Sequence, residues 1–234
     1  MPEVSSIISL LSINNFVTLG AAFAGAALAF GLERYQRGAE RIDNNVVAGT
    51  RALFVLGRMF DVLYQYQKEI IDPYRGKTDA WLNTDTQLAQ DDYAFHIPFD
   101  DLTFVLRNDP TTFQLLSLTE HRFHNIRSSI NARNELVLRE LWPKMSDARI
   151  PVGAAVEEVA LREFLGTALT RKLEGTIVSL TDLVDKEVIS VMEAYEEVYL
   201  SLKRIYPKEE FLRFKFPDDS RRHQPKGGSD TPSQ

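Results

Sequence analysis

Five polar side chains in the middle of the chain have the types and spacing of a binding or catalytic surface: Glu120, His124, Arg127, Asn131 and Asn134. Steps of four, three, four and three residues put all five on one side of a helix. If this polar face points into the protein, loss of water perturbs its ionisable groups, which could then bind an anion, a metal or a polar partner. The alternative is a solvated face, or a polar layer that fixes helix register at a cost in stability.

The few histidines of the chain restrict its metal chemistry. There are four, His96, His121, His124 and His223, and cysteine is absent. Di-iron sites in helical bundles use two Glu-x-x-His pairs, and this sequence contains no such pair. The glycine-rich dinucleotide and phosphate motifs, Gly-x-Ser-x-Gly and His-Glu-x-x-His are absent too. We therefore assign no catalytic residue and expect no metal and no cofactor.

Helix-start and helix-stop signals place the polar face on one long helix. Asp109 and Pro110 combine an N-cap residue with proline at the first helical position. Pro143 is expected to end this helix at about Trp142. Pro98 opens a short helix that precedes it and runs to Arg107.

The segments on either side of this region are also predicted to be helical. Apolar residues at three- and four-residue spacing continue up to Pro73, and a longer series of the coiled-coil type predicts the longest helix, over residues 154–206. Residues 74–97 lack a sustained period, apart from a short helix expected over residues 81–88. A connection of this length is often functional, so it could act as a lid over the polar face.

The predicted fold class is all-α. We expect an elongated antiparallel helical bundle over residues 33–217, with one very long C-terminal helix. Residues 218–234 are rich in Gly, Pro, Ser, Asp and Gln, and they lack the apolar surface needed to fold, which predicts a disordered tail.

The N-terminal region reads as a membrane anchor. Residues 4–32 contain no charged side chain, and residues 13–32 supply the twenty or so apolar positions that a bilayer core of ~30 Å needs. Residues 1–12 would form a short extracytoplasmic N-terminus. Arg34, Arg37 and Arg41 follow the run and no Lys or Arg precedes it, so the positive-inside rule predicts a single-pass protein of a bacterial inner membrane, N-terminus out, with a cytoplasmic C-terminal domain.

A cleaved signal peptide is the rival interpretation of this run. Ala27-Leu28-Ala29 resembles a small-x-small cleavage site, but Glu3 is the only charged residue before the apolar run, where a signal peptide carries Lys or Arg. In the anchor, the small residues Gly20, Ala24, Ala27 and Gly31 recur at helical spacing, so two such helices could approach closely. The alternative is that these residues are merely common in membrane helices.

Composition and charge narrow the choice of partners. The formal net charge of −6 gives no nucleic-acid signature, and we expect no nucleic acid as partner. The expected partners are the lipid bilayer and either a second copy of the chain or another protein. The function that follows is a membrane-anchored scaffold, sensor or accessory subunit, with an enzyme or ligand-binding domain that uses the polar face as the alternative and an oligomeric membrane effector as a further one.

Overall fold

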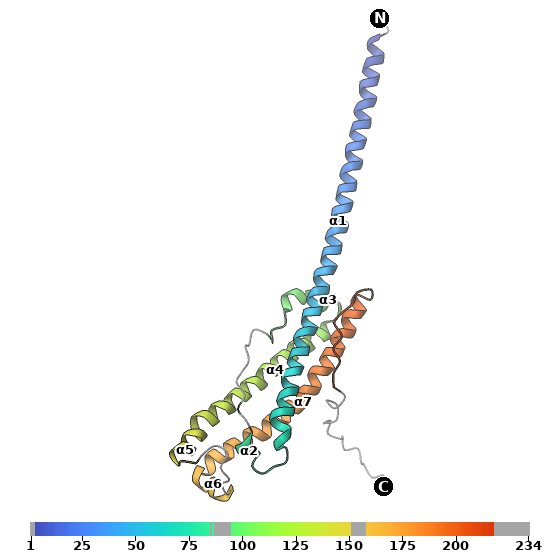
Figure 1. Cartoon of the computed structure of the whole chain (residues 1–234). Helices are drawn as coiled ribbons and strands as arrows, with labels where there is room; N and C mark the ends of the chain where they lie inside the picture. The colour runs from blue at the N-terminus through green and yellow to red at the C-terminus, as the bar shows by residue number, and fades with distance from the viewer. Residues whose placement is uncertain (1–2, 85, 87–94, 151–157, 218–234) are drawn as a thin grey trace, which may run out of the picture. The chain divides into compact units, whose positions relative to one another are not determined.

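The computed structural model describes residues 3–84, 86, 95–150 and 158–217, with side chains from Phe23 onward. Over these residues the ordered elements are all helices and no strand occurs, which confirms the all-α prediction (Figure 1). The chain divides into two units, Met1–Val47 and Ala48–Gln234. The predicted tail over residues 218–234 lies outside the described residues, and so do residues 85, 87 and 88 of the helix predicted over residues 81–88.

The first helix, α1 (Glu3–Gln65), carries both the uncharged N-terminal run and the first packed segment. Within the second unit its buried side chains follow helical spacing and include Leu53, Leu56, Phe60 and Leu63. A π-helical turn, Tyr66–Ile71, and a short 3-10 turn, Asp72–Tyr74, complete the segment. The end predicted at Pro73 is confirmed.

No helix among the described residues is both long enough and apolar enough to cross a membrane. The predicted span over residues 13–32 includes ten positions, residues 13–22, whose side chains are not described. The membrane anchor therefore stays a prediction.

Short elements connect α1 to the next long helix. They are α2 (Ala80–Asn83), a 3-10 turn (Phe99–Leu102) and α3 (Thr103–Asn108). The 3-10 turn and α3 together confirm the short helix predicted between Pro98 and Arg107. Trp81 of α2 is buried in a cluster at one end of the second unit, where it packs with Leu141, Leu165 and Leu169.

The polar face lies on α4 (Pro110–Leu136), which begins as the sequence predicts. Asp109 is its N-cap: Oδ1 accepts a hydrogen bond from the Thr112 backbone N–H at 3.1 Å. The prediction that Pro143 ends the helix is wrong. A π-helical turn, Val137–Leu141, runs directly into α5 (Trp142–Asp147), so the helical chain continues past Pro143, which lies in the first turn of α5.

The prediction of one continuous helix over residues 154–206 is also wrong. Residues 151–157 lie outside the described part, α6 covers Glu158–Leu165 and α7 covers Thr167–Ile205. Gly166 separates them with a φ of 84°, a left-handed conformation that glycine adopts without steric cost and that breaks a right-handed helix. The long C-terminal helix is confirmed as α7, but α1 is the longer of the two.

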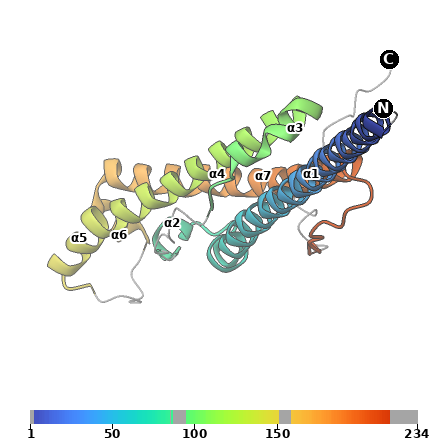
Figure 2. The same cartoon turned by 90° about the horizontal axis from the view of Figure 1, so that it is seen from above.

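The second unit is a bundle in which α7 runs antiparallel to both α4 and the packed part of α1. At one end of α7, Arg204 contacts Asp109 at the start of α4, with Nη1 and Oδ2 3.2 Å apart. At the other end, Lys172 contacts Glu140 beyond the end of α4. Gln67 donates a hydrogen bond to Asp185 at 2.7 Å, which fixes the α1 segment against the middle of α7. Figures 1 and 2 both show α4 and α7 side by side.

The chain after α7 returns along the bundle as an extended segment with three phenylalanines. Phe216 packs edge-on against Phe60 of α1 and against Tyr195 of α7, and Phe211 is buried. The Tyr195 hydroxyl donates to the Leu212 carbonyl and accepts from the Phe214 N–H, both at 2.7 Å. This segment therefore covers the seam between α1 and α7 in the second unit.

Candidate functional site

The five predicted polar residues are not gathered in one site. From Glu120 to Asn134 the axis of α4 advances about 21 Å, at about 1.5 Å per residue. Glu120 and His124 are partly buried, Arg127 and Asn134 are buried, and Asn131 is exposed. The face therefore divides into two parts. Glu120 and His124 form a partly buried pair near the middle of α4, and the buried residues Arg127 and Asn134 lie nearer its C-terminal end.

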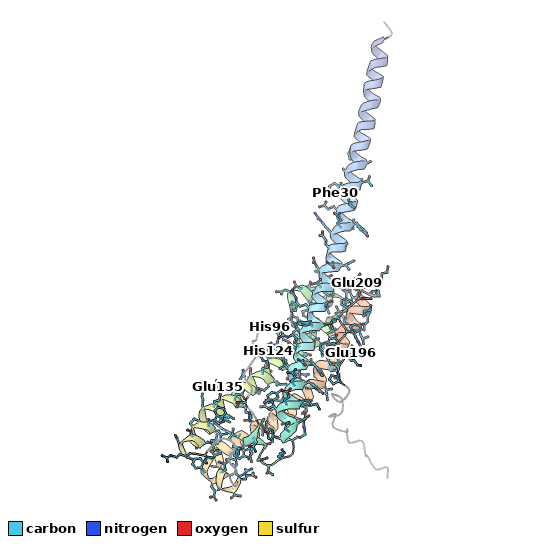
Figure 3. The ribbon with its side chains drawn as sticks, in the orientation of Figure 1. Phe30, His96, His124, Glu135, Glu196 and Glu209 are labelled. Atoms are coloured by element: carbon cyan, nitrogen blue, oxygen red, sulfur yellow. The ribbon has the colours of Figure 1, made fainter. Side chains whose placement is uncertain are left out.

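His96 joins the upper pair from a different part of the chain. Its Nδ1 lies 3.3 Å from Oε1 of Glu120, and its ring stacks on that of His124 with centroids 4.9 Å apart and planes tilted by 29°. One ligand atom from each of the three residues lies within 4.8 Å of the other two. Figure 3 labels His96 and His124 beside each other on the bundle. Sequence reasoning missed His96, because 24 residues separate it from Glu120 and no local pattern links them.

Glu120 is positioned by the main chain as well as by its helix. Its Oε1 accepts a hydrogen bond from the backbone N–H of Ile97 at 2.8 Å. The same contact holds the segment that carries His96 against α4. The Glu120 side chain is only 15 % exposed, whereas the His96 side chain is 57 % exposed. The cluster is therefore buried on the side of Glu120 and open to solvent on the outer side, where His96 lies.

Two imidazoles and one carboxylate form a ligand set that suits a divalent transition metal. In the part of the chain that the structure describes, His96, Glu120 and His124 are the one such group of three. We expected no metal from the sequence, because its histidines show no paired spacing. His121 does not join the cluster: it is exposed, and Nε2 lies 3.1 Å from the Asn125 side-chain nitrogen.

Arg127 is not part of the cluster formed by His96, Glu120 and His124. Its guanidinium lies over the ring of Phe95, 5.0 Å from the centroid, and Arg58 of α1 lies 5.1 Å from the same centroid. Phe95 is fully buried and also packs against Phe123. Cation–π contacts of this kind help to hold the buried guanidinium of Arg127 against the aromatic rings.

Next to Asn134 lies a buried arginine, Arg133, which the predicted polar face did not include. Arg133 is almost fully buried and donates a hydrogen bond to the Thr84 carbonyl. Burial raises the pKa of the nearby Tyr66 hydroxyl, and the positive charge of Arg133 lowers it in part. The Tyr66 hydroxyl is buried and forms no hydrogen bond with any described residue.

Glu187 of α7 is a second ionisable group in the bundle that sequence reasoning missed. It is 5 % exposed, and its Oε1 is buried and accepts no hydrogen bond from the described residues. Burial raises its pKa to about 7, and the charge of Arg122 on α4 opposes part of that effect. Its place on the inner side of α7, three residues after Val184, is the signal that could have identified it.

A cavity of about 340 Å³ lies between α7 and residues that begin the 74–97 connection. Its wall includes Tyr74, Arg75, Lys77 and Thr181. Arg75 donates hydrogen bonds to Asp185 at 2.8 Å and to Asp72 at 3.0–3.1 Å, and the Asp185 bond raises the pKa of Arg75. These pairs hold the start of the connection against α7. Residues 85 and 87–94, which the predicted lid requires, lie outside the described part.

The predicted membrane-helix stripe is visible in part. Ala24, Ala27 and Gly31 are exposed, and a Cβ added at Gly31 would meet no atom within 4 Å. Gly20 precedes the residues whose side chains are described.

Comparison of the chain with protein-family models, with curated proteins and with solved structures gives no match.

Proposed function

We propose that this protein is a membrane-anchored helical domain that acts through binding to other proteins, as a scaffold, sensor or accessory subunit. The N-terminal run of α1 supports the anchor. Phe23, Leu28, Phe30 and Tyr35 are each more than 70 % exposed, and Leu32 is 59 % exposed. So much exposed apolar surface is unfavourable in water.

The distribution of these side chains around α1 favours lipid over one partner helix. At about 100° per residue, Phe23 and Phe30 share one side, while Leu28, Leu32 and Tyr35 lie on the opposite side. A helix that meets a single partner needs an apolar stripe, whereas a helix that is apolar all round is typical of a bilayer span. Figure 3 labels Phe30 in this segment.

The proposed span covers residues 13–32, followed by Arg34, Arg37 and Arg41. Described side chains begin at Phe23, ten residues into this span, so the span extends beyond the described side chains. The arginines favour a cytoplasmic second unit. The small residues of the span, Gly20, Ala24, Ala27 and Gly31, would allow two copies to associate in the bilayer.

Membrane retention after an alkaline carbonate wash tests the anchor. The full chain should remain in the membrane pellet. Replacing Ala24 and Ala27 together by arginine should release it, because each arginine near a helix centre costs about 2.5–3.5 kcal/mol on the insertion scale. Ala39→Arg, which lies in the charged segment after the span, should leave the chain in the pellet. Recovery of the unmodified chain in the supernatant would contradict the anchor.

The interaction role has a separate test. Crosslinking in cells, followed by detergent extraction, should recover the chain with a second copy or another protein. A chain that stays monomeric in detergent and crosslinks to nothing would count against a scaffold or accessory role.

A further inference from the structure

We propose that His96, Glu120 and His124 bind one divalent transition-metal ion, with Zn²⁺ as the best match. The site is built from two segments that meet only in the folded bundle: α4 supplies Glu120 and His124, and the segment before Pro98 supplies His96. The inference does not depend on the membrane anchor, since all three ligands belong to the second unit.

The distances fit such an ion with little rearrangement. Ligand atoms about 2.0–2.1 Å from a tetrahedral Zn²⁺ lie about 3.3 Å from one another. Nδ1 of His96 and Oε1 of Glu120 are already 3.3 Å apart, which is long for a hydrogen bond and matches that separation. All three ligand atoms lie within 4.8 Å of one another, so they need to approach by at most about 1.5 Å to reach the spacing around a tetrahedral ion.

The types of ligand select the metal. Two imidazole nitrogens disfavour Ca²⁺ and Mg²⁺, which prefer oxygen ligands, and favour Zn²⁺ or a similar first-row ion. Three protein ligands leave one position of a tetrahedral ion open to water or to an external donor, as in catalytic rather than structural zinc sites. The open outer side of the cluster, where His96 is more than half exposed, gives an ion a path of entry.

The surroundings hold the ligands in place before an ion arrives. Glu120 and His124 are one helical turn apart on α4, so their side chains project from the same side. The Ile97 N–H fixes Glu120 Oε1 at 2.8 Å, and the Phe123 ring packs edge-on against His124. A carboxylate has about four acceptor positions, so Glu120 can keep this hydrogen bond and still bind an ion. The nearest buried cation along α4, Arg127, has its guanidinium over Phe95 and Phe123.

Isothermal titration calorimetry with Zn²⁺ alone tests the site on the full chain, purified in detergent without a histidine tag and stripped of metal. We expect one ion per chain. His124→Ala, His96→Ala and Glu120→Gln should each weaken binding by at least about tenfold, since even the outer partners of metal ligands contribute that much. In Glu120→Gln the amide oxygen can still accept the Ile97 N–H, so this variant separates loss of a ligand from loss of structure.

His121→Ala is the matched control, because His121 lies exposed on the same helix and outside the cluster. It should bind Zn²⁺ like the unmodified chain, and circular dichroism should show equal helix content in all variants. A tenfold excess of Ca²⁺ should not displace Zn²⁺. The inference is overturned if the unmodified chain binds no Zn²⁺, or if the Glu120→Gln and His124→Ala variants, folded, bind it as tightly as the control does.

Discussion

Replacing Glu187 by glutamine should stabilise the protein strongly at pH 8 and much less at pH 5. In the folded chain this carboxyl is buried against α4, and burial raises its pKa from 4.5 to about 7. In the unfolded chain it is hydrated and has its ordinary pKa. The folded state therefore keeps a proton on Glu187 over a pH range where the unfolded state has lost it.

The sign and size of the effect follow from that difference. Stability from the protonated group is fully present below pH 4.5 and is lost as the pH rises to about 7, because the unfolded state then binds fewer protons. The interval between 4.5 and about 7 is about 2.5 pH units, and at 1.36 kcal/mol per unit it corresponds to about 3 kcal/mol. Glutamine has nearly the same shape and no charge, so Glu187→Gln avoids this loss.

Urea unfolding of the full chain, followed by far-UV circular dichroism at pH 5, 6, 7 and 8, measures the effect. Other groups titrate over the same range, so the informative quantity is the free energy of unfolding of Glu187→Gln minus that of the unmodified chain. This difference should grow with pH and reach about 3 kcal/mol at pH 8. Glu193→Gln, an exposed position on the same helix, is the control and should show no such trend. A difference for Glu187→Gln that is constant across pH, or that becomes destabilising at pH 8, would refute the reasoning.

Two further predictions concern packing of the bundle. Asp109→Ala should lower the free energy of unfolding by about 2 kcal/mol, because it removes the α4 cap and the contacts with Ser201 and Arg204; Asp109→Asn, which can still cap, should lose less in the same urea assay. The Gly49→Ala variant should be less stable than the Gly175→Ala variant by about 1–3 kcal/mol. A Cβ added at Gly49 would lie 2.8 Å from the Leu202 side chain, whereas a Cβ added at Gly175 would meet no atom within 4 Å. Both variants gain the same helix propensity, so the difference between them reports the steric contact. Equal stabilities of the two glycine variants would show that Leu202 yields freely.

The sequence predicted the ends of helices correctly where a single residue strongly favours one conformation. Asp109 and Pro110 set the start of α4, and Pro73 lies in the turn that completes the α1 segment. Gly166 and Pro143 were misjudged for the opposite reason. A glycine within an apolar helical series is compatible with either continuation or a break, and a proline is compatible with either a stop or the first turn of a new helix.

Helical geometry predicts which polar residues share one side of α4, but it does not predict which of them are buried. A step of four residues overshoots a full turn by about 40°, and a step of three falls short by about 60°. These offsets nearly cancel, so Asn131 stays within the arc of α4 that the other four residues occupy. It is nevertheless exposed while Arg127 and Asn134 are buried, so burial along this face depends on which segments pack over each turn of α4. The contact between His96 and Glu120 depends on how the chain before Pro98 packs on α4, which no spacing within one helix encodes.

X-ray absorption at the zinc edge of the Zn²⁺-loaded full chain tests most directly whether His96, Glu120 and His124 form a metal centre. We predict a coordination shell with two imidazole nitrogens and a carboxylate oxygen at about 2.0–2.2 Å, and loss of one imidazole contribution in His124→Ala. A shell of water and carboxylate oxygens without imidazole, or a spectrum unchanged by His124→Ala, would contradict the account.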